Sequence, residues 1–481
     1  MVQNTPQTAS IFRTVILFLL LIPIALTGQT KNGWTIMHYA VGSNSSEIDL
    51  LSDVQEMMVG KQSEGYEILL LIDRTPGFSE DAVVLGSNFT DTRLYRIIPN
   101  GYEELEGKEF LPELSVNSTY DANMGDADVL KRFVQYGKKY YPADHYMLVL
   151  RSHGNGTGMC PDPEGGKADK LYPGELRDVL SAEESVDILG LDVCSMAGLE
   201  NLYEWRPNAG GFGADYVLAS APLSAAWSYD TIFSRLQTES EASTSGESNY
   251  FASGEEVNLD PLKMTPKTFS ELLIEEIYDS QRWSSWGLFD NTEITSVKQA
   301  IDALAQALAE EDKATLITHI EQALGYHHNT HDNLEIAQLA FPYVDAYDFF
   351  VRISKDSGLS ETTRECATLV CDGLQKLVMN SYYGQGYLPE TNDFVEGGSG
   401  VYLVLPMGHK IFSQSKQSFW THMDWYHPED KQDLGNAYGN YDWCSDGAIP
   451  GNNKVETFYE LLDWLFDTNN DSSGGVNGYR W

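Results

Sequence analysis

The chain has 481 residues, of which 42% are hydrophobic and 12% aromatic, and this composition predicts a folded protein. With 31 basic and 71 acidic residues, its formal net charge is −40. Such a charge repels nucleic-acid phosphates and anionic membranes, so we expect neither as a partner, whereas it attracts cations and basic polypeptides. The simplest interpretation of the charge is that it keeps an exported protein soluble.

Residues 1–28 have the pattern of a signal peptide. Arg13 precedes an apolar run from Val15 to Leu26, which is shorter than the roughly 18 residues of a membrane-spanning helix. Small and polar residues follow, so we predict cleavage near Gly28, with an uncleaved anchor as the alternative. The mature protein is therefore expected to be secreted, periplasmic or on the cell surface, with no membrane contact after cleavage.

Residues 31–237 are predicted to form an α/β catalytic domain in which a mostly parallel sheet is covered on both faces. Apolar runs alternate there with stretches of helical periodicity. In such sheets, functional sites lie beyond the carboxyl ends of the strands. The expected strands are 34–41, 66–72, 146–152 and 186–193, and the expected helices are 44–58 and 126–141.

The rest of the chain is predicted to form two further regions. Residues 238–395 are expected to be mainly helical, after a stretch rich in Ser, Glu and Gly at 238–258 that marks a surface excursion or a domain boundary. Residues 396–481 are expected to form a C-terminal subdomain with a late strand. The expected elements are helices at 268–277, 295–309, 345–353 and 455–466, and a strand at 398–406.

The chain has five cysteines, an odd number that leaves at least one thiol unpaired in an exported monomer. We expect Cys194 to be that thiol. The others, Cys160, Cys366, Cys371 and Cys444, either form two disulfides with a pairing that the spacing does not reveal, or remain buried thiols.

His153 and Cys194 each follow a predicted strand. Parallel strands would bring both side chains to one sheet edge, where a thiol and an imidazole act as nucleophile and proton carrier. A helix expected at 196–203 would place the thiol in a helix dipole that favours the thiolate. The backbone N–H groups of Gly154 and Cys194 would hold the oxyanion. Asp192 lies on the same strand face as Cys194, where it either lines a pocket for a basic side chain or pairs with a neighbouring donor.

Two other signatures are incomplete. The segment Gly154–Gly158 lacks the full dinucleotide-binding pattern, and prolines follow it instead of a helix. The segment around Ser399 lacks the glycine spacing of a serine-hydrolase nucleophile elbow. A single cysteine at a strand end is more often a core residue than a nucleophile. The alternative to an enzyme is therefore a non-catalytic surface or binding protein on the same scaffold.

Several stretches, in this order, resemble the clostripain family of cysteine peptidases, which belongs to the caspase and legumain clan. Their combined order is specific, and together they span most of residues 34–410. They are Trp34-Thr-Ile-Met-His-Tyr39, Ile72-Asp-Arg74, Asn123-Met-Gly-Asp126, His153-Gly154, Asp192-Val-Cys-Ser-Met196 with Glu200, Tyr343-Val-Asp-Ala-Tyr-Asp348 and Gly400-Val-Tyr-Leu-Val-Leu-Pro406.

The resemblance implies a caspase-like α/β/α sandwich and a cysteine endopeptidase with His153 as general acid/base and Cys194 as nucleophile. It also implies cleavage after Arg or Lys, with Asp192 in the specificity pocket. The family usually carries further acids where this chain has Ala221-Pro222. We therefore consider Asp215 and Asp230 as candidate substrate-binding substitutes.

The resemblance further implies activation by internal cleavage and a calcium requirement. Lys167 and Lys170 are the candidate processing sites, because they lie among Gly and Pro between the two catalytic segments. Residues Asp467–Asp471 resemble the start of an EF-hand loop but lack its glycine and closing glutamate, so a solvated turn is the alternative. We expect a monomer that acts on protein or peptide substrates.

Overall fold

The computed structural model describes residues 32–114, 119–163, 169–239, 259–281, 284–326, 343–382, 398–405, 438–449, 451 and 454–466. Within these residues lies a nine-stranded sheet with the order β12-β10-β9-β8-β5-β1-β2-β3-β4. Its strands are β1 (Asn32–Gly42), β2 (Tyr66–Arg74), β3 (Thr92–Ile98), β4 (Gly101–Glu104), β5 (Ala143–Arg151), β8 (Val186–Asp192), β9 (Ala214–Ala219), β10 (Trp286–Asp290) and β12 (Val378–Tyr382).

The centre of the sheet is parallel, as the sequence predicted. Strands β2, β1, β5, β8 and β9 pair in parallel, and antiparallel strands extend both edges. Strand β1 is mostly apolar, and both of its faces are buried. Trp34 and Ile36 enter one hydrophobic core, whereas Met37 and Tyr39 enter the other. Each fully buried side chain of this kind contributes about 1.5–3 kcal/mol relative to an exposed one.

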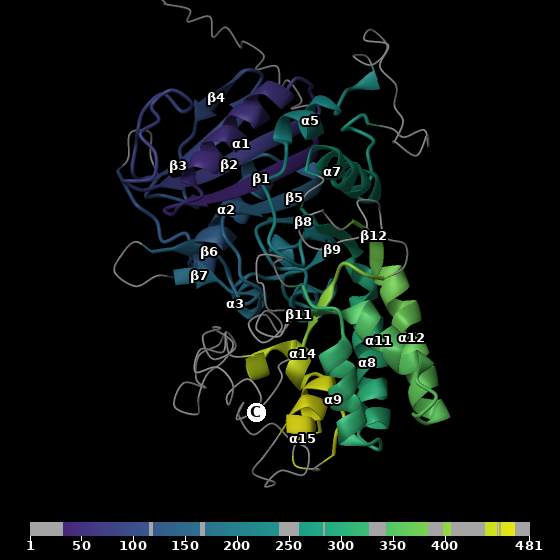
Figure 1. Ribbon diagram of the computed structural model, residues 1–481. Helices are drawn as coiled ribbons and strands as arrows, with labels where there is room; N and C mark the ends of the chain where they lie inside the picture. The colour runs from purple at the N-terminus through teal and green to yellow at the C-terminus, as the bar shows by residue number, and fades with distance from the viewer. Residues whose placement is uncertain are drawn as a thin grey trace, which may run out of the picture.

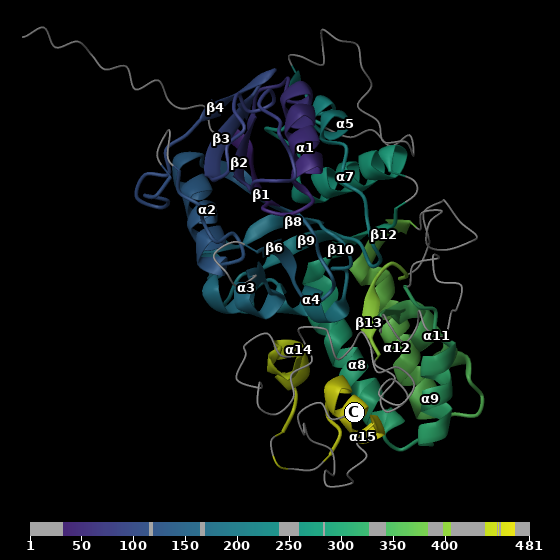
Figure 2. The same cartoon turned by 60° about the vertical axis from the view of Figure 1, so that its left-hand side comes forward.

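Helices cover both faces of the sheet (Figures 1 and 2). The helices α1 (Glu47–Gly60), α5 (Tyr229–Ser234) and α7 (Pro266–Ser280) bury their apolar residues in one core. On the other face, the second core contains residues of α2 (Ala127–Tyr140), α3 (Pro173–Val179) and α4 (Leu199–Glu204). The predicted start of α2 is confirmed, because the Asp126 carboxylate accepts the Asp128 amide at 2.8 Å and caps the helix.

A group of helices lies beyond one end of the sheet (Figure 1). It comprises α8 (Ile294–Leu308), α9 (Lys313–Gln322), α11 (Ala346–Lys355), α12 (Glu361–Leu377) and α15 (Phe458–Phe466). The short strands β11 (Tyr343–Asp345) and β13 (Tyr402–Val404) pair with each other, and β13 is the late strand that the sequence predicted, although shorter.

The central sheet extends past residue 237, where the sequence placed the end of the catalytic domain. Strands β10 and β12 come from the region expected to be mainly helical, yet they pair with β9 and with each other. Both strands have only five residues. In so short a run, periodicity does not distinguish a buried strand from a buried helix.

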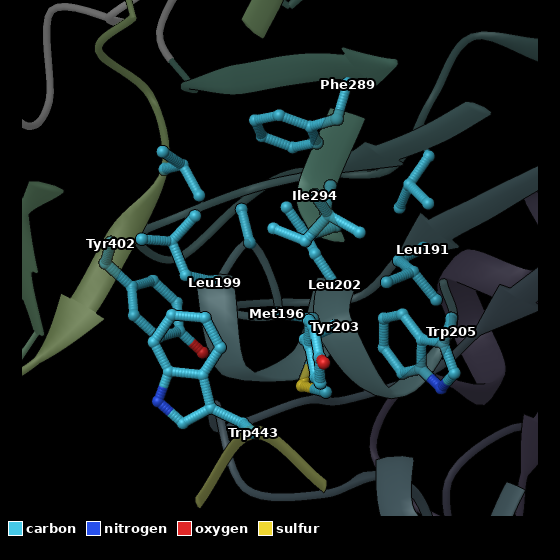
Figure 3. Packing of buried hydrophobic residues seen from close by; sticks show 14 of the residues in the cluster. Leu191, Met196, Leu199, Leu202, Tyr203, Trp205, Phe289, Ile294, Tyr402 and Trp443 are labelled. Carbon is cyan, nitrogen blue, oxygen red and sulfur yellow. The ribbon is translucent and has the colours of Figure 1, made fainter. Parts of the chain in front are cut away.

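The segment after Cys194 packs against distant parts of the chain (Figure 3). Met196 and Leu199 lie in the same cluster as Phe289 of β10, Tyr402 of β13 and Trp443 of α14 (Asp442–Ser445). This cluster therefore joins the cysteine-bearing segment to the C-terminal third of the chain.

All five cysteines are free thiols. Cys160, Cys371 and Cys444 are buried, and Cys194 and Cys366 are partly exposed. The structure therefore shows the alternative of unpaired thiols and neither of the two disulfides. No helix among the described residues has the length and apolar character to cross a bilayer. The predicted signal peptide lies outside the described residues.

Candidate active site

The two sequence-predicted catalytic residues follow neighbouring strands in register. Strands β5 and β8 pair in parallel, with Arg151 opposite Asp192. His153 and Cys194 each come two residues later. The strand ends also approach closely at Gly154, where an added Cβ atom would lie 2.4 Å from the Cys194 carbonyl oxygen. The fold therefore brings the histidine segment against the cysteine segment at the carboxyl edge of the sheet.

His153 is accessible at this edge, and its Nε2 atom lies 2.9 Å from Oγ of Ser45 in the loop between β1 and α1. Partial burial lowers the pKa of His153 below its ordinary value, the positive charge of Arg151 lowers it further, and Asp49 opposes both effects. At neutral pH the imidazole is therefore uncharged and able to accept a proton.

A tight turn carries the chain away from Cys194. Ser195 has a φ of +60°, a left-handed conformation that costs roughly 1–3 kcal/mol in a residue other than glycine. Two hydrogen bonds hold it there. The Ser195 amide donates to the Pro222 carbonyl at 2.8 Å, and the Tyr402 hydroxyl donates to the Ser195 carbonyl at 2.9 Å. The Ala221-Pro222 segment thus braces the turn.

The predicted helix dipole at Cys194 is wrong. Helix α4 begins at Leu199, so Cys194 does not lie at a helix N-terminus. Ser224 approaches the sulfur instead, with its amide at 3.4 Å and its hydroxyl at 3.8 Å from Sγ. The thiol in turn donates to the Ser224 carbonyl at 3.8 Å.

The predicted oxyanion donors are the amides of Gly154 and Cys194. Among the described residues, neither the Gly154 nor the Cys194 amide donates a hydrogen bond to the backbone. The chain around Gly154 is held by flanking bonds, from the Cys160 amide to the His153 carbonyl at 2.9 Å and from the Asn155 amide to the Gly158 carbonyl at 3.1 Å. Two N–H groups at adjoining strand ends can hold a developing oxyanion.

Asp192 lies below the catalytic edge in a buried ion-pair network. Its Oδ2 atom accepts the Tyr229 hydroxyl at 2.9 Å and the Trp227 amide at 3.3 Å, and lies 3.2 Å from Nε of Arg151. The same Nε lies 2.7 Å from Asp53 of α1. Burial raises the pKa of Asp192, and Arg151 opposes this effect. Of the two sequence-based alternatives for Asp192, the structure shows the pairing with a neighbouring donor.

Asp215 and Asp230, the further candidate substrate-binding residues, lie in different places. Asp230, on α5, is close to Glu56, whose carboxylate accepts the Tyr229 amide at 3.0 Å. Asp215 cannot line a substrate pocket at the catalytic edge. It follows Ala214 at the amino end of β9, which lies at the opposite edge of the sheet. It lines a cavity of about 270 Å³ together with Asp187.

The processing and calcium candidates lie mostly beyond the described residues. Lys167 and the segment Asp467–Asp471 fall outside them. Lys170 is half-buried on β7 (Asp169–Leu171), with Nζ 5.8 Å from the centre of the Tyr172 ring. In the described part of the chain, no group of three or more His, Cys, Asp or Glu side chains is arranged to hold a metal ion.

Three residues at this edge were not predicted from the sequence: Ser45, Ser224 and Arg151. Arg151 had a usable signal, because it precedes His153 by two positions just as Asp192 precedes Cys194. Ser45 and Ser224 lie in loops without a motif, and only the fold brings them to His153 and Cys194.

A caspase-like α/β fold with cysteine and histidine segments at adjoining strand ends defines a cysteine endopeptidase. The model of the clostripain family matches residues 38–464, and the chain belongs to that family. Clostripain from Hathewaya histolytica is 37% identical over 478 residues, which cover 93% of this chain and 89% of that protein. The chain is thus an enzyme and not the non-catalytic binding protein considered as the alternative.

A solved structure shares the fold. An inactive zymogen C11 protease from Parabacteroides distasonis is 16% identical to this chain, and the TM-score is 0.52. The match covers 82% of this chain and 98% of the other. A secreted C11 cysteine protease from Bacteroides thetaiotaomicron, in complex with an irreversible peptide inhibitor, is 18% identical, with a TM-score of 0.48 and coverage of 82% and 99%.

Proposed function

We propose that this peptidase acts as an exported monomer in which Cys194 attacks the scissile carbonyl and His153 carries the proton. The observation that carries the proposal is the register of β5 and β8, which pairs Arg151 with Asp192 and starts both catalytic segments at the same level. The close approach of Gly154 to the Cys194 carbonyl supports it independently.

The reaction proceeds through an acyl-enzyme. His153 takes the proton of the Cys194 thiol, and the thiolate forms a bond to the carbonyl carbon. The oxyanion is held by the amides of Gly154 and Cys194. When the C–N bond breaks, the imidazolium protonates the leaving amine. Water then attacks the thioester with His153 as base, which releases the carboxylic acid and restores the thiol.

We also propose that the residue before the scissile bond is Arg or Lys. Support comes from Asp192, buried below the catalytic edge, and from the acidic side chains of Glu56 and Asp230 close by. Because Arg151 already pairs with Asp192, a substrate cation has to share this carboxylate. The preference therefore depends on the net charge of the whole cluster.

A matched peptide series tests both parts. Fluorogenic peptides with Arg, Lys or Gln before the scissile bond are compared for kcat/KM with wild type, Cys194→Ala and His153→Ala. We expect hydrolysis to fall at least about 10³-fold in both variants and to be strongest for Arg or Lys. Activity in Cys194→Ala would refute the nucleophile. Equal rates for Gln and Arg would refute only the basic preference.

Self-cleavage and calcium are separate proposals. Cleavage after Lys167 or Lys170 would split the chain between the two catalytic segments, and identical bands for purified wild type and Cys194→Ala would refute it. For calcium, the described residues contain no group of three or more His, Cys, Asp or Glu side chains arranged to hold the ion, and the candidate segment Asp467–Asp471 lies outside them. Unchanged activity in the presence of a chelator would refute a requirement.

A further inference from the structure

The loop between β1 and α1 contacts the catalytic histidine. Ser45 Oγ lies 2.9 Å from Nε2 of His153, a good hydrogen-bond distance. Ser45 does not serve α1 instead, because the residue at the N-cap position is Ser46 and no side chain caps this helix. The side-chain contact of Ser45 is therefore with the imidazole.

Asn44 fixes the position of this loop. Its side-chain amide donates to the Val41 carbonyl at 3.3 Å, to Ser152 Oγ at 3.1 Å and to the Pro161 carbonyl at 3.0 Å. Its oxygen accepts the amide of Ser46 at 2.9 Å. Asn44 is 9% exposed, so these bonds are shielded from water. Since Ser152 directly precedes His153, Asn44 holds the loop to the histidine segment immediately before Ser45.

A neutral imidazole carries one N–H group, and the partner of one nitrogen decides the protonation of the other. Resting on the proposed Cys194/His153 chemistry, we propose that Ser45 is a positioning residue. Its Oγ accepts the N–H of His153 Nε2, which leaves Nδ1 unprotonated to take the thiol proton. The same bond persists in the imidazolium, where an acceptor at Nε2 stabilises the positive charge.

Removal of the hydroxyl tests the proposal. In Ser45→Ala we expect kcat to fall about tenfold or more, because the imidazole loses its fixed tautomer and orientation, while KM stays within about twofold. The pKa of His153 should also fall further, because the charged form loses its acceptor. The acid limb of kcat/KM then moves to lower pH. Ser45→Thr keeps the oxygen and should restore both values.

Two controls make the result specific. Ser52→Ala removes an exposed hydroxyl from α1 and should leave kcat and the pH profile unchanged. The thermal midpoint of each variant reports folding. Wild-type kcat and pH profile in Ser45→Ala would overturn the proposal, as would equal losses in Ser45→Ala and Ser45→Thr with an unmoved acid limb. Full activity of His153→Ala would instead overturn the dyad itself.

Discussion

Gly154 has a steric role at the residue level in addition to its proposed oxyanion amide. An added Cβ would lie 2.4 Å from the Cys194 carbonyl oxygen and 3.1 Å from Cβ of Val193, so the strand ends would have to separate. We expect Gly154→Ala to lower kcat/KM about 100-fold, since small displacements of reacting groups have effects of this size. The loss of stability should be about 1–3 kcal/mol.

Peptide hydrolysis and thermal unfolding check this prediction together. Gly101→Ala is the matched control, because its Cβ would meet only the Ile98 side chain at 3.7 Å. If Gly154→Ala keeps wild-type kcat/KM, the strand ends do not need this close approach.

Arg151 sets the charge beneath the dyad. It lowers the pKa of His153, second to burial, so the acid limb of kcat/KM in the wild type should lie below pH 6.5. The sign follows from the chemistry, because His153 accepts the thiol proton only when neutral and activity falls as pH drops through its pKa. In Arg151→Met the limb should move up, yet remain below pH 6.5 because burial persists.

Arg151→Met leaves two buried carboxylates without their cation, a change expected to cost about 3–5 kcal/mol. The double variant Arg151→Met with Asp53→Asn removes one charge of each sign and should recover part of that stability. Its pH profile then reports the charge effect in a folded enzyme. A wild-type acid limb above pH 6.5, or a limb that does not move in the double variant, would contradict the prediction.

At the level of elements, the sequence predicts what depends on local pattern. The apolar runs of β1 and β2 and the Asp126 cap of α2 stand out because burial and capping leave clear signatures. The helix expected at 196–203 begins only at Leu199, because Ser195 takes a left-handed turn that tertiary hydrogen bonds stabilise. Helical periodicity of the side chains does not report such a turn.

In the candidate site, too, some residues are predictable from the sequence and others are not. His153 and Cys194 are predictable, because a residue that follows an apolar strand must lie at the edge of a parallel sheet. Ser45 is 108 positions from His153, and Ser224 is 30 positions from Cys194. Their contacts depend on how two loops cross that edge, and local propensity contains no information about such crossings.

At the level of the whole molecule, Glu200 of α4 links the segment after Cys194 to the C-terminal region. Its carboxylate accepts the Val404 amide of β13 at 2.9 Å and the Tyr438 hydroxyl at 3.2 Å, and its other oxygen is buried without a partner among the described residues. Complete burial raises the pKa of Glu200 to about 7. The stability of the contact between α4 and the C-terminal region is therefore expected to depend on pH.

The sign of that sensitivity is fixed by linkage. In the unfolded chain Glu200 loses its proton near its ordinary pKa, whereas in the folded protein it holds the proton until about pH 7. Its contribution to the free energy of unfolding is therefore fully present at low pH and is lost as pH rises from about 4.5 to 7.

Glu200→Gln keeps an acceptor oxygen and cannot ionise. The variant should be more stable than wild type at pH 8, by at most about 3 kcal/mol, and nearly equal to it at pH 4.5. Thermal or urea unfolding at both pH values measures the difference, with the exposed Glu64→Gln as the control for loss of one charge. A stability gain independent of pH would mean that Glu200 does not titrate in this contact.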